Sequence, residues 1–182
     1  MASILGWQSA GTVISSYFVS KAFATLPSQS GSHIPACMKN PAVFGCSGSG
    51  CSEDCLFVNI WTPYLPLNGR APQTKLKAVM CWIHGDAFAG GTGADPTFDS
   101  GNLKSSGDVV MVAINYRLST LGFLALNDGK TNENYGLDDI ITAFDWVRTH
   151  ITDFGGDPNR ITIFRHSDLL GLELSWSAIW IT

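Results

Sequence analysis

The chain has 182 residues, a length typical of one domain with a single hydrophobic core. Lysines and arginines number 11 against 15 aspartates and glutamates, and this net charge of −4 excludes the basic surface that binds a nucleic-acid backbone or an anionic membrane. Hydrophobic residues reach 45% and charged residues 14%, which excludes a disordered chain and leads us to expect faces covered by a partner or by further polypeptide. No run of about 18 apolar residues is present, so we expect no membrane-spanning helix.

The first part of the chain, residues 1–30, mixes small, apolar and hydroxyl side chains without clear periodicity, and we predict a leader without a defined element. Within it, the stretch from Thr12 to Leu26 is moderately apolar. Because Lys21 interrupts this stretch and no basic residue precedes it, a secretory signal peptide is not established by the sequence.

Four of the five cysteines fall between positions 37 and 55, namely Cys37, Cys46, Cys51 and Cys55. The glycines and serines between them favour a short loop closed by a disulfide, which would imply an oxidising compartment. Zinc ligation and unpaired thiols remain alternatives, although no second pair of residues with metal-site spacing follows.

Three apolar runs in the middle of the chain predict strands. Residues from Leu56 to Trp61 are rich in β-formers and are followed by Pro63, which ends the strand because it cannot donate to a ladder. The runs from Ala78 to Ile83 and from Val109 to Ile114 are unbroken, as in strands buried on both faces of an α/β sheet. The glycine-rich stretch from His84 to Gly93 lies between them and is predicted to be a functional loop or turn.

An irregular segment after Arg117 is followed by a predicted helix from Asp138 to Ile151, whose apolar residues recur at helical spacing on one face. Gly155 and Gly156 would end this helix, and residues from Ile161 to Phe164 predict a further short strand. The order strand, helix, strand predicts a parallel unit with a right-handed crossover and places the chain in the α/β class.

The segment from Ser52 to Pro63, SEDCLFVNIWTP, resembles the signature S-E-D-C-L-x-x-N-x-x-T-P of type-B carboxylesterases, the family that includes cholinesterases and fungal lipases. Several of the segments that match the family resemble the sequences of its fungal members most closely. The resemblance covers residues 31–164 and implies an α/β-hydrolase fold, of which this chain would hold the amino-terminal part of the central sheet with a crossover helix. Five further motifs follow in the family's order: Trp82–Gly85, Ile114–Leu118, Leu121–Leu124, Asn134–Leu137 and Phe154–Pro158.

The resemblance implies a serine hydrolase that attacks a small carboxylic ester or lipid, forms an acyl-enzyme and releases it to water without a cofactor or metal. Ser167 stands where the family places its nucleophile. The family's His-Gly-Gly-Gly-Phe aligns with residues 84–88, so the backbone N–H groups of Asp86, Ala87 and Asp168 would form the oxyanion hole. Glycines suit that loop because its backbone approaches the substrate closely and can need a positive φ.

Departures from the family pattern lead us to expect little or no turnover. The carboxylate of Asp86 would bring negative charge beside the developing oxyanion. Arg165 and Leu169 replace both glycines of the Gly-x-Ser-x-Gly turn, and their side chains should crowd it. No histidine follows Ser167 to act as its base, and adjacent His166 and Asp168 do not form a triad with it because neighbouring side chains point apart.

The similarity stops after Phe164, and we interpret residues 165–182 as a divergent tail left by a frameshift or retained intron, which sequencing of the transcript across this junction would test. Ester hydrolysis is then the ancestral activity. The alternatives are a noncatalytic fragment or interaction module, and a fragment whose unpaired sheet edge prevents stable folding.

The resemblance also implies structural roles for several further residues. Cys37 and Cys55 match the family's early disulfide, which leaves Cys46 and Cys51 as extra cysteines. Together with the cysteine cluster, this favours a secreted or extracellular location. The residues point to no particular oligomeric state. The positions expected to support the floor of the active site are Asn115, Tyr116, Arg117 and Asp139.

Overall fold

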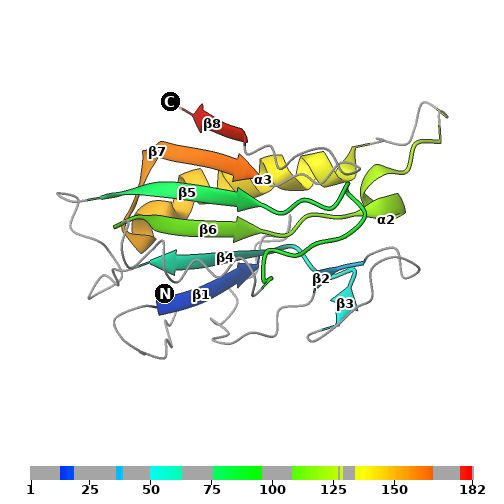
Figure 1. The fold of residues 1–182 in the computed structure, drawn as a ribbon, viewed down its shortest axis with the longest axis horizontal. Helices are drawn as coiled ribbons and strands as arrows, with labels where there is room; N and C mark the ends of the chain where they lie inside the picture. The colour runs from blue at the N-terminus through cyan, green and yellow to red at the C-terminus, as the bar shows by residue number, and fades with distance from the viewer. Residues whose placement is uncertain are drawn as a thin grey trace.

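The main element of the computed structural model is a six-stranded sheet with the strand order β1-β4-β6-β5-β7-β8 (Figure 1). The structure describes residues 13–18, 36–38, 50–62, 76–95, 108–126, 128, 134–165 and 177–181. β5, β6 and β7 are parallel, whereas β1, β4 and β8 each pair antiparallel with their neighbours. The strands are β1 (Val13–Phe18), β4 (Phe57–Thr62), β5 (Lys77–Ile83), β6 (Val110–Ile114), β7 (Gly156–Arg165) and β8 (Ser177–Ile181).

The three central apolar runs form strands as predicted, and their burial explains why. All five residues of β6 are buried, which is the pattern of a strand covered on both faces. Cys81 on β5 lies opposite Val112 of β6 and Ile163 of β7, at the centre of the sheet. Removing these aliphatic side chains from water contributes about 1.5–3 kcal/mol each.

The predicted helix is α3 (Tyr135–His150), which lies across one face of the sheet (Figure 1). It begins three residues before the predicted start, at a point where the N–H groups of Leu137 and Asp138 donate to the carbonyl of Asn134. Ala143 and Val147 are buried against the strands, as the apolar spacing predicts. Within the described residues, no helix has the length and apolarity needed to cross a membrane.

The end of α3 uses both predicted glycines. A 3-10 turn, η3 (Ile151–Phe154), follows the helix, and Gly155 then takes a left-handed φ of 81°. Gly156 begins β7 so close to its neighbours that an added Cβ would lie 2.5 Å from Cγ1 of Ile151 and 2.8 Å from Cγ2 of Val79. The parallel strand–helix–strand unit is therefore confirmed, with β5 lying between β6 and β7.

Several short or terminal elements differ from the predictions. α2 (Ser119–Phe123) is helical where we expected irregular chain, because five residues are too few to display a helical period. The leader contains β1, which pairs with β4, and the tail contains β8, which pairs with β7. A separate parallel pair joins β2 (Ala36–Cys37) to β3 (Cys51–Ser52). All these strands depend on partners distant in the sequence, which local patterns do not reveal.

Candidate active site

The loops that follow β5 and β6 meet at one edge of the sheet. β5 and β6 are parallel and end in register at Ile83 and Ile114, so the segments that begin at His84 and Asn115 leave the same edge. β4 runs in the opposite direction, and its beginning at Phe57 reaches that edge as well. The carboxyl ends of parallel strands are the usual location of ligand sites in α/β sheets.

Residues 86–88 form a left-handed turn at this edge, hereafter the 86–88 turn. The φ angles are 74° at Asp86, 51° at Ala87 and 60° at Phe88. The N–H of Ala89 donates to the carbonyl of Asp86 over 2.9 Å and closes the turn. Left-handed backbone costs a non-glycine residue roughly 1–2 kcal/mol, so this loop keeps a conformation suited to glycine although two of the family's glycines are replaced here.

The 86–88 turn is held against α2. The N–H of Ser119 donates to the carbonyl of Phe88 over 2.8 Å. The Phe88 ring, although half exposed, packs on Phe123 with ring centroids 4.8 Å apart and meets Tyr116 edge-on at 6.5 Å. The sequence did not indicate this role of Ser119. The contact is made by its backbone N–H, which every residue except proline has, so the identity of the side chain does not predict it.

Below the turn, His84 stacks on Tyr116 with ring centroids 4.6 Å apart. Both residues are buried, and the Tyr116 hydroxyl donates to the carbonyl of His84 over 3.1 Å. Burial raises the pKa of Tyr116 well above its usual range, the negative charge of Asp86 raises it further, and Arg165 partly opposes the rise. Tyr116 is therefore a neutral hydrogen-bond donor, and charged groups from both the 86–88 turn and the end of β7 act on it.

Asn115 connects three segments of the site floor. Its side-chain oxygen accepts hydrogen bonds from the N–H of Gly93 at 2.7 Å and the hydroxyl of Thr92 at 3.3 Å. Its side-chain nitrogen donates to the carbonyl of Cys55 at 3.1 Å, and its backbone N–H donates to that of Phe57 at 3.0 Å. One buried amide thus fixes the loop after β5 relative to the start of β4.

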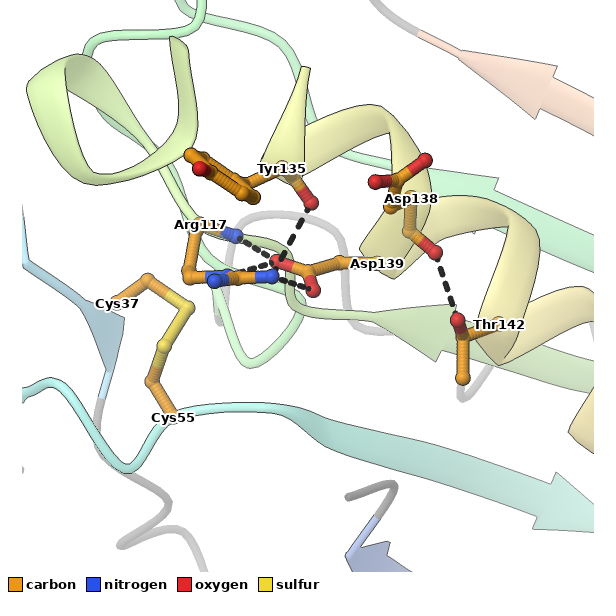
Figure 2. Close-up of polar contacts among 7 residues, drawn as sticks. All are labelled: Cys37, Cys55, Arg117, Tyr135, Asp138, Asp139 and Thr142. Atoms are coloured by element: carbon orange, nitrogen blue, oxygen red, sulfur yellow. Dashed lines mark hydrogen bonds and ion pairs between the residues drawn. A yellow bond between two sulfur atoms is a disulfide. The ribbon is translucent and has the colours of Figure 1, made fainter. Parts of the chain in front are cut away.

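Arg117 and Asp139 form a forked ion pair beside this floor (Figure 2). The Arg117 Nε donates to Oδ2 of Asp139 at 2.7 Å, and Nη2 donates to Oδ1 at 2.6 Å. The backbone N–H of Arg117 adds a bond of 3.0 Å to Oδ2, and Nη2 also donates to the carbonyl of Tyr135 at 3.3 Å. These hydrogen bonds raise the pKa of Arg117, and the pair fixes α3 to the segment that follows β6.

The disulfide between Cys37 and Cys55 is present, as the resemblance implied, with a Cα–Cα distance of 4.8 Å (Figure 2). It lines a pocket of about 230 Å³ together with Met38, Glu53, Arg117, Leu118 and Leu121.

Cys51 is also disulfide-bonded. Cys81 is a free thiol whose pKa burial raises to about 12. No group of three or more metal-binding side chains occurs among the described residues.

The predicted nucleophile and its neighbours are not placed. His166, Ser167, Asp168 and Leu169 lie outside the described residues, and their roles stay predictions. The last described residue before them is Arg165, which ends β7 opposite Ile83 of β5 and has an exposed side chain. Of the oxyanion donors, Asp86 and Ala87 are therefore the two whose backbone the structure describes.

The fold is that of the α/β-hydrolase esterases, and the sequence comparison defines the family: the profile of the carboxylesterase family matches residues 25–168. The chain belongs to the carboxylesterase family, and its fold is an incomplete α/β-hydrolase fold. The expected likeness to fungal members and the boundaries at residues 30 and 164 stay predictions.

Among its relatives, fumonisin B1 esterase of Sphingopyxis macrogoltabida is 44% identical over 151 residues, which cover 78% of this chain and 27% of that protein. Para-nitrobenzyl esterase of Bacillus subtilis is 43% identical over 118 residues, covering 64% and 23% of the two chains. A solved carboxylesterase of Geobacillus stearothermophilus matches with a TM-score of 0.68 and 33% identity, over 88% of this chain and 35% of its own. The chain thus spans about a quarter of the length of these curated relatives.

Proposed function

We propose that this chain is a carboxylic ester hydrolase by descent, with a serine acyl-enzyme mechanism whose turnover is severely impaired. Membership of the carboxylesterase family supports the class of reaction. The proposed substrate is a small carboxylic ester or lipid, which Ser167 would attack while backbone N–H groups at the carboxyl edge of the sheet receive the oxyanion.

The observation that carries the proposal is the 86–88 turn. Its left-handed backbone keeps the shape of a glycine-rich oxyanion loop, which supports descent from a working hydrolase. At the same residue, Asp86 brings a carboxylate to the site, and its negative charge is, after burial, the second cause of the raised pKa of Tyr116. Loss of one oxyanion donor costs about 3 kcal/mol in the transition state, and negative charge at the same position opposes the remaining donors.

The two histidines among the described residues, His84 and His150, do not support the role of a general base. His84 is buried and stacked on Tyr116. His150 ends α3 and packs on Trp146 with ring centroids 4.7 Å apart, and α3 returns from the carboxyl edge to the beginning of β7 at the other edge. A serine hydroxyl without a base is a poor nucleophile near neutral pH.

The disulfide between Cys37 and Cys55 supports an extracellular or other oxidising location for this activity. Burial of both sulfur-bearing residues makes the bond structural rather than catalytic, because thiol exchange needs access for the attacking thiolate. A location outside the reducing cytosol is therefore part of the proposal.

Hydrolysis of p-nitrophenyl acetate by the purified chain, compared with Ser167→Ala, tests the proposal. We expect slow hydrolysis that Ser167→Ala abolishes, together with specific capture of a fluorophosphonate probe at Ser167, whereas equal rates and no capture in the folded chain would favour a noncatalytic chain. A cooperative thermal transition in both proteins must accompany the rates, so that lost folding is not mistaken for lost catalysis. Rapid hydrolysis that disappears in Ser167→Ala would contradict the impairment.

A noncatalytic interaction module is the second candidate, because apolar side chains are exposed near the same edge. Phe88 of the turn, Leu121 of α2 and Leu137 of α3 are each between 42% and 50% exposed. A folded chain that fails to bind the fluorophosphonate and associates through this patch would favour the module. Replacement of Leu121 by serine should then weaken the association.

A further inference from the structure

The oxidation state of the cysteines identifies a bond beyond the one between Cys37 and Cys55. Cys51 is disulfide-bonded, Cys37 and Cys55 bond to each other, and Cys81 is a buried free thiol. The sequence holds five cysteines. The one cysteine left as a partner for Cys51 is Cys46, which lies outside the described residues and is identified from the count alone.

We infer that Cys46 and Cys51 form a second disulfide, nested inside the loop that the bond between Cys37 and Cys55 closes. This segment then carries two structural disulfides in place of the extra thiols or zinc ligands that the sequence left open. A zinc site on these cysteines is excluded by the same assignment, because zinc binds thiolates and a disulfide sulfur is not one.

The geometry around Cys51 suits such a bond. Cys51 begins β3, which pairs with β2 so that Cys51 lies opposite Ala36 and Ser52 lies opposite Cys37. The N–H of Ala36 donates to the carbonyl of Gly50 over 3.1 Å, and Gly50 has a φ of 81° with no neighbour within 4 Å of an added Cβ. Cys51 is thus fixed beside the outer disulfide, and the residue before it, Gly50, has the left-handed backbone that favours glycine.

The spacer of this bond is also favourable. Residues 47–50 are Ser-Gly-Ser-Gly, which have no bulky side chain to hinder the closure of a small ring. Glycines supply the unusual backbone angles that such a ring requires. A bridge needs its two Cα atoms within about 4.4–6.8 Å, a separation that a chain with four small intervening residues can span.

Formation of the bond is a two-electron oxidation. Two thiols lose two protons and two electrons to a disulfide oxidant such as oxidised glutathione, which is reduced to two thiols as the sulfur–sulfur bond forms. This reaction belongs to an oxidising compartment, in agreement with the buried outer disulfide.

Differential alkylation of the chain secreted from an oxidising host tests the inference. Free thiols of the unfolded protein are blocked with iodoacetamide, the disulfides are then reduced, and the new thiols are labelled with N-ethylmaleimide before each site is read by mass spectrometry. We expect iodoacetamide on Cys81 alone and N-ethylmaleimide on the other four cysteines. Iodoacetamide on Cys46 or Cys51 of the monomer would overturn the inference.

The variant Cys46→Ser assigns the pairing. Cys51 should gain the iodoacetamide label, whereas Cys37 and Cys55 should keep the second label. Release of Cys37 or Cys55 in place of Cys51 would show a different connectivity and overturn the nested arrangement. The matched control Cys81→Ser should lose the iodoacetamide label and leave the other four sites unchanged. If Cys46→Ser fails to fold, cleavage of the oxidised wild-type protein after both Lys39 and Glu53 gives the assignment, because the nested pairing releases the peptide that holds Cys46 and Cys51 and the other pairings do not.

Discussion

The backbone N–H of Ser119 donates a hydrogen bond of 2.8 Å to the carbonyl oxygen of Phe88. Both residues have left-handed backbone, with φ values of 52° and 60°. The bond joins the first residue of α2 to the last residue of the 86–88 turn, so two strained positions hold each other in place. The turn is therefore supported from outside its own loop.

Replacement of Ser119 by glycine should raise the free energy of unfolding by about 1 kcal/mol, because glycine takes a positive φ without the steric cost that serine carries. The Ser119 hydroxyl is buried without a hydrogen-bond partner among the described residues, so its removal also relieves a desolvated group. Urea unfolding measures the change. Ser119→Ala is the control, since it removes the hydroxyl and keeps the strain. A glycine variant no more stable than the alanine variant would show that φ strain is not the cause.

Replacement of Asp86 by asparagine should lower the pKa of Tyr116. A nearby negative charge disfavours the tyrosinate, so removal of the charge makes deprotonation easier, while burial still keeps the pKa above its usual range. Asparagine keeps the side-chain shape and tolerates left-handed backbone. Ultraviolet titration of tyrosine absorbance measures the shift, with Tyr116→Phe to assign the signal. An unchanged Tyr116 titration would refute electrostatic coupling between the turn and the floor.

Cys81 should make the fold less stable in alkali. Burial raises its pKa from 9.0 to about 12, so the folded state keeps the proton that the unfolded state releases above pH 9. The free energy of unfolding should then fall as pH rises from 9 to about 12. Cys81→Val should remove the part of this fall that begins at pH 9, and leave a later decline from Tyr116. Unfolding in urea at a series of pH values measures both slopes, and identical slopes in the two proteins would refute the assignment.

Replacement of Asp139 by asparagine should destabilise the fold by about 1–3 kcal/mol, because the forked bond to Arg117 loses its charge and one acceptor. The buried carboxylate makes this pair stronger than an exposed one, although the partly exposed Arg117 limits the loss. The matched control on the same helix is Asp145→Asn, at an exposed position where we expect a change within about 0.5 kcal/mol. Equal effects of the two substitutions on thermal unfolding would contradict the structural role of the pair.

If the nested disulfide forms, mild reduction of the folded protein should open it first. Cys37 and Cys55 are 2% and 1% exposed, whereas Cys51 is partly exposed, and an attacking thiolate must reach a sulfur atom. Brief treatment with dithiothreitol followed by alkylation should label Cys46 and Cys51 before the outer pair. Simultaneous labelling of all four sites would indicate that the segment opens as one unit.

The sequence predicted the elements whose own residues carry the pattern. β5 and β6 were predicted from unbroken apolar runs, and α3 was predicted from apolar residues at helical spacing. In each case the residues that become buried lie within the element itself, so the local sequence displays the pattern. β2 and β3, at two residues each, exist only through their pairing with each other, and β1 depends on the distant β4. Nothing local in these segments could have shown their partners.

The same division applies to the site. The glycine-rich stretch after His84 indicated a functional loop, and the family's glycines suggested the positive φ found at Asp86 and Ala87. The contact from Ser119 and the stacking of His84 on Tyr116 arise from packing between separate loops, so single-residue patterns did not predict them.

The pairing of β8 along the outer side of β7 affects how copies of this chain could meet. Residues Ile161 to Arg165 of β7 already have β8 as their neighbour, in a ladder from Ile161 opposite Ile181 to Arg165 opposite Ser177. A second molecule that extended the sheet on this side could not pair with β7, because the backbone of β7 is already hydrogen-bonded to β8. It would have to pair with β8. Edge-to-edge contact between copies on this side would therefore involve the backbone of a five-residue strand and not that of β7.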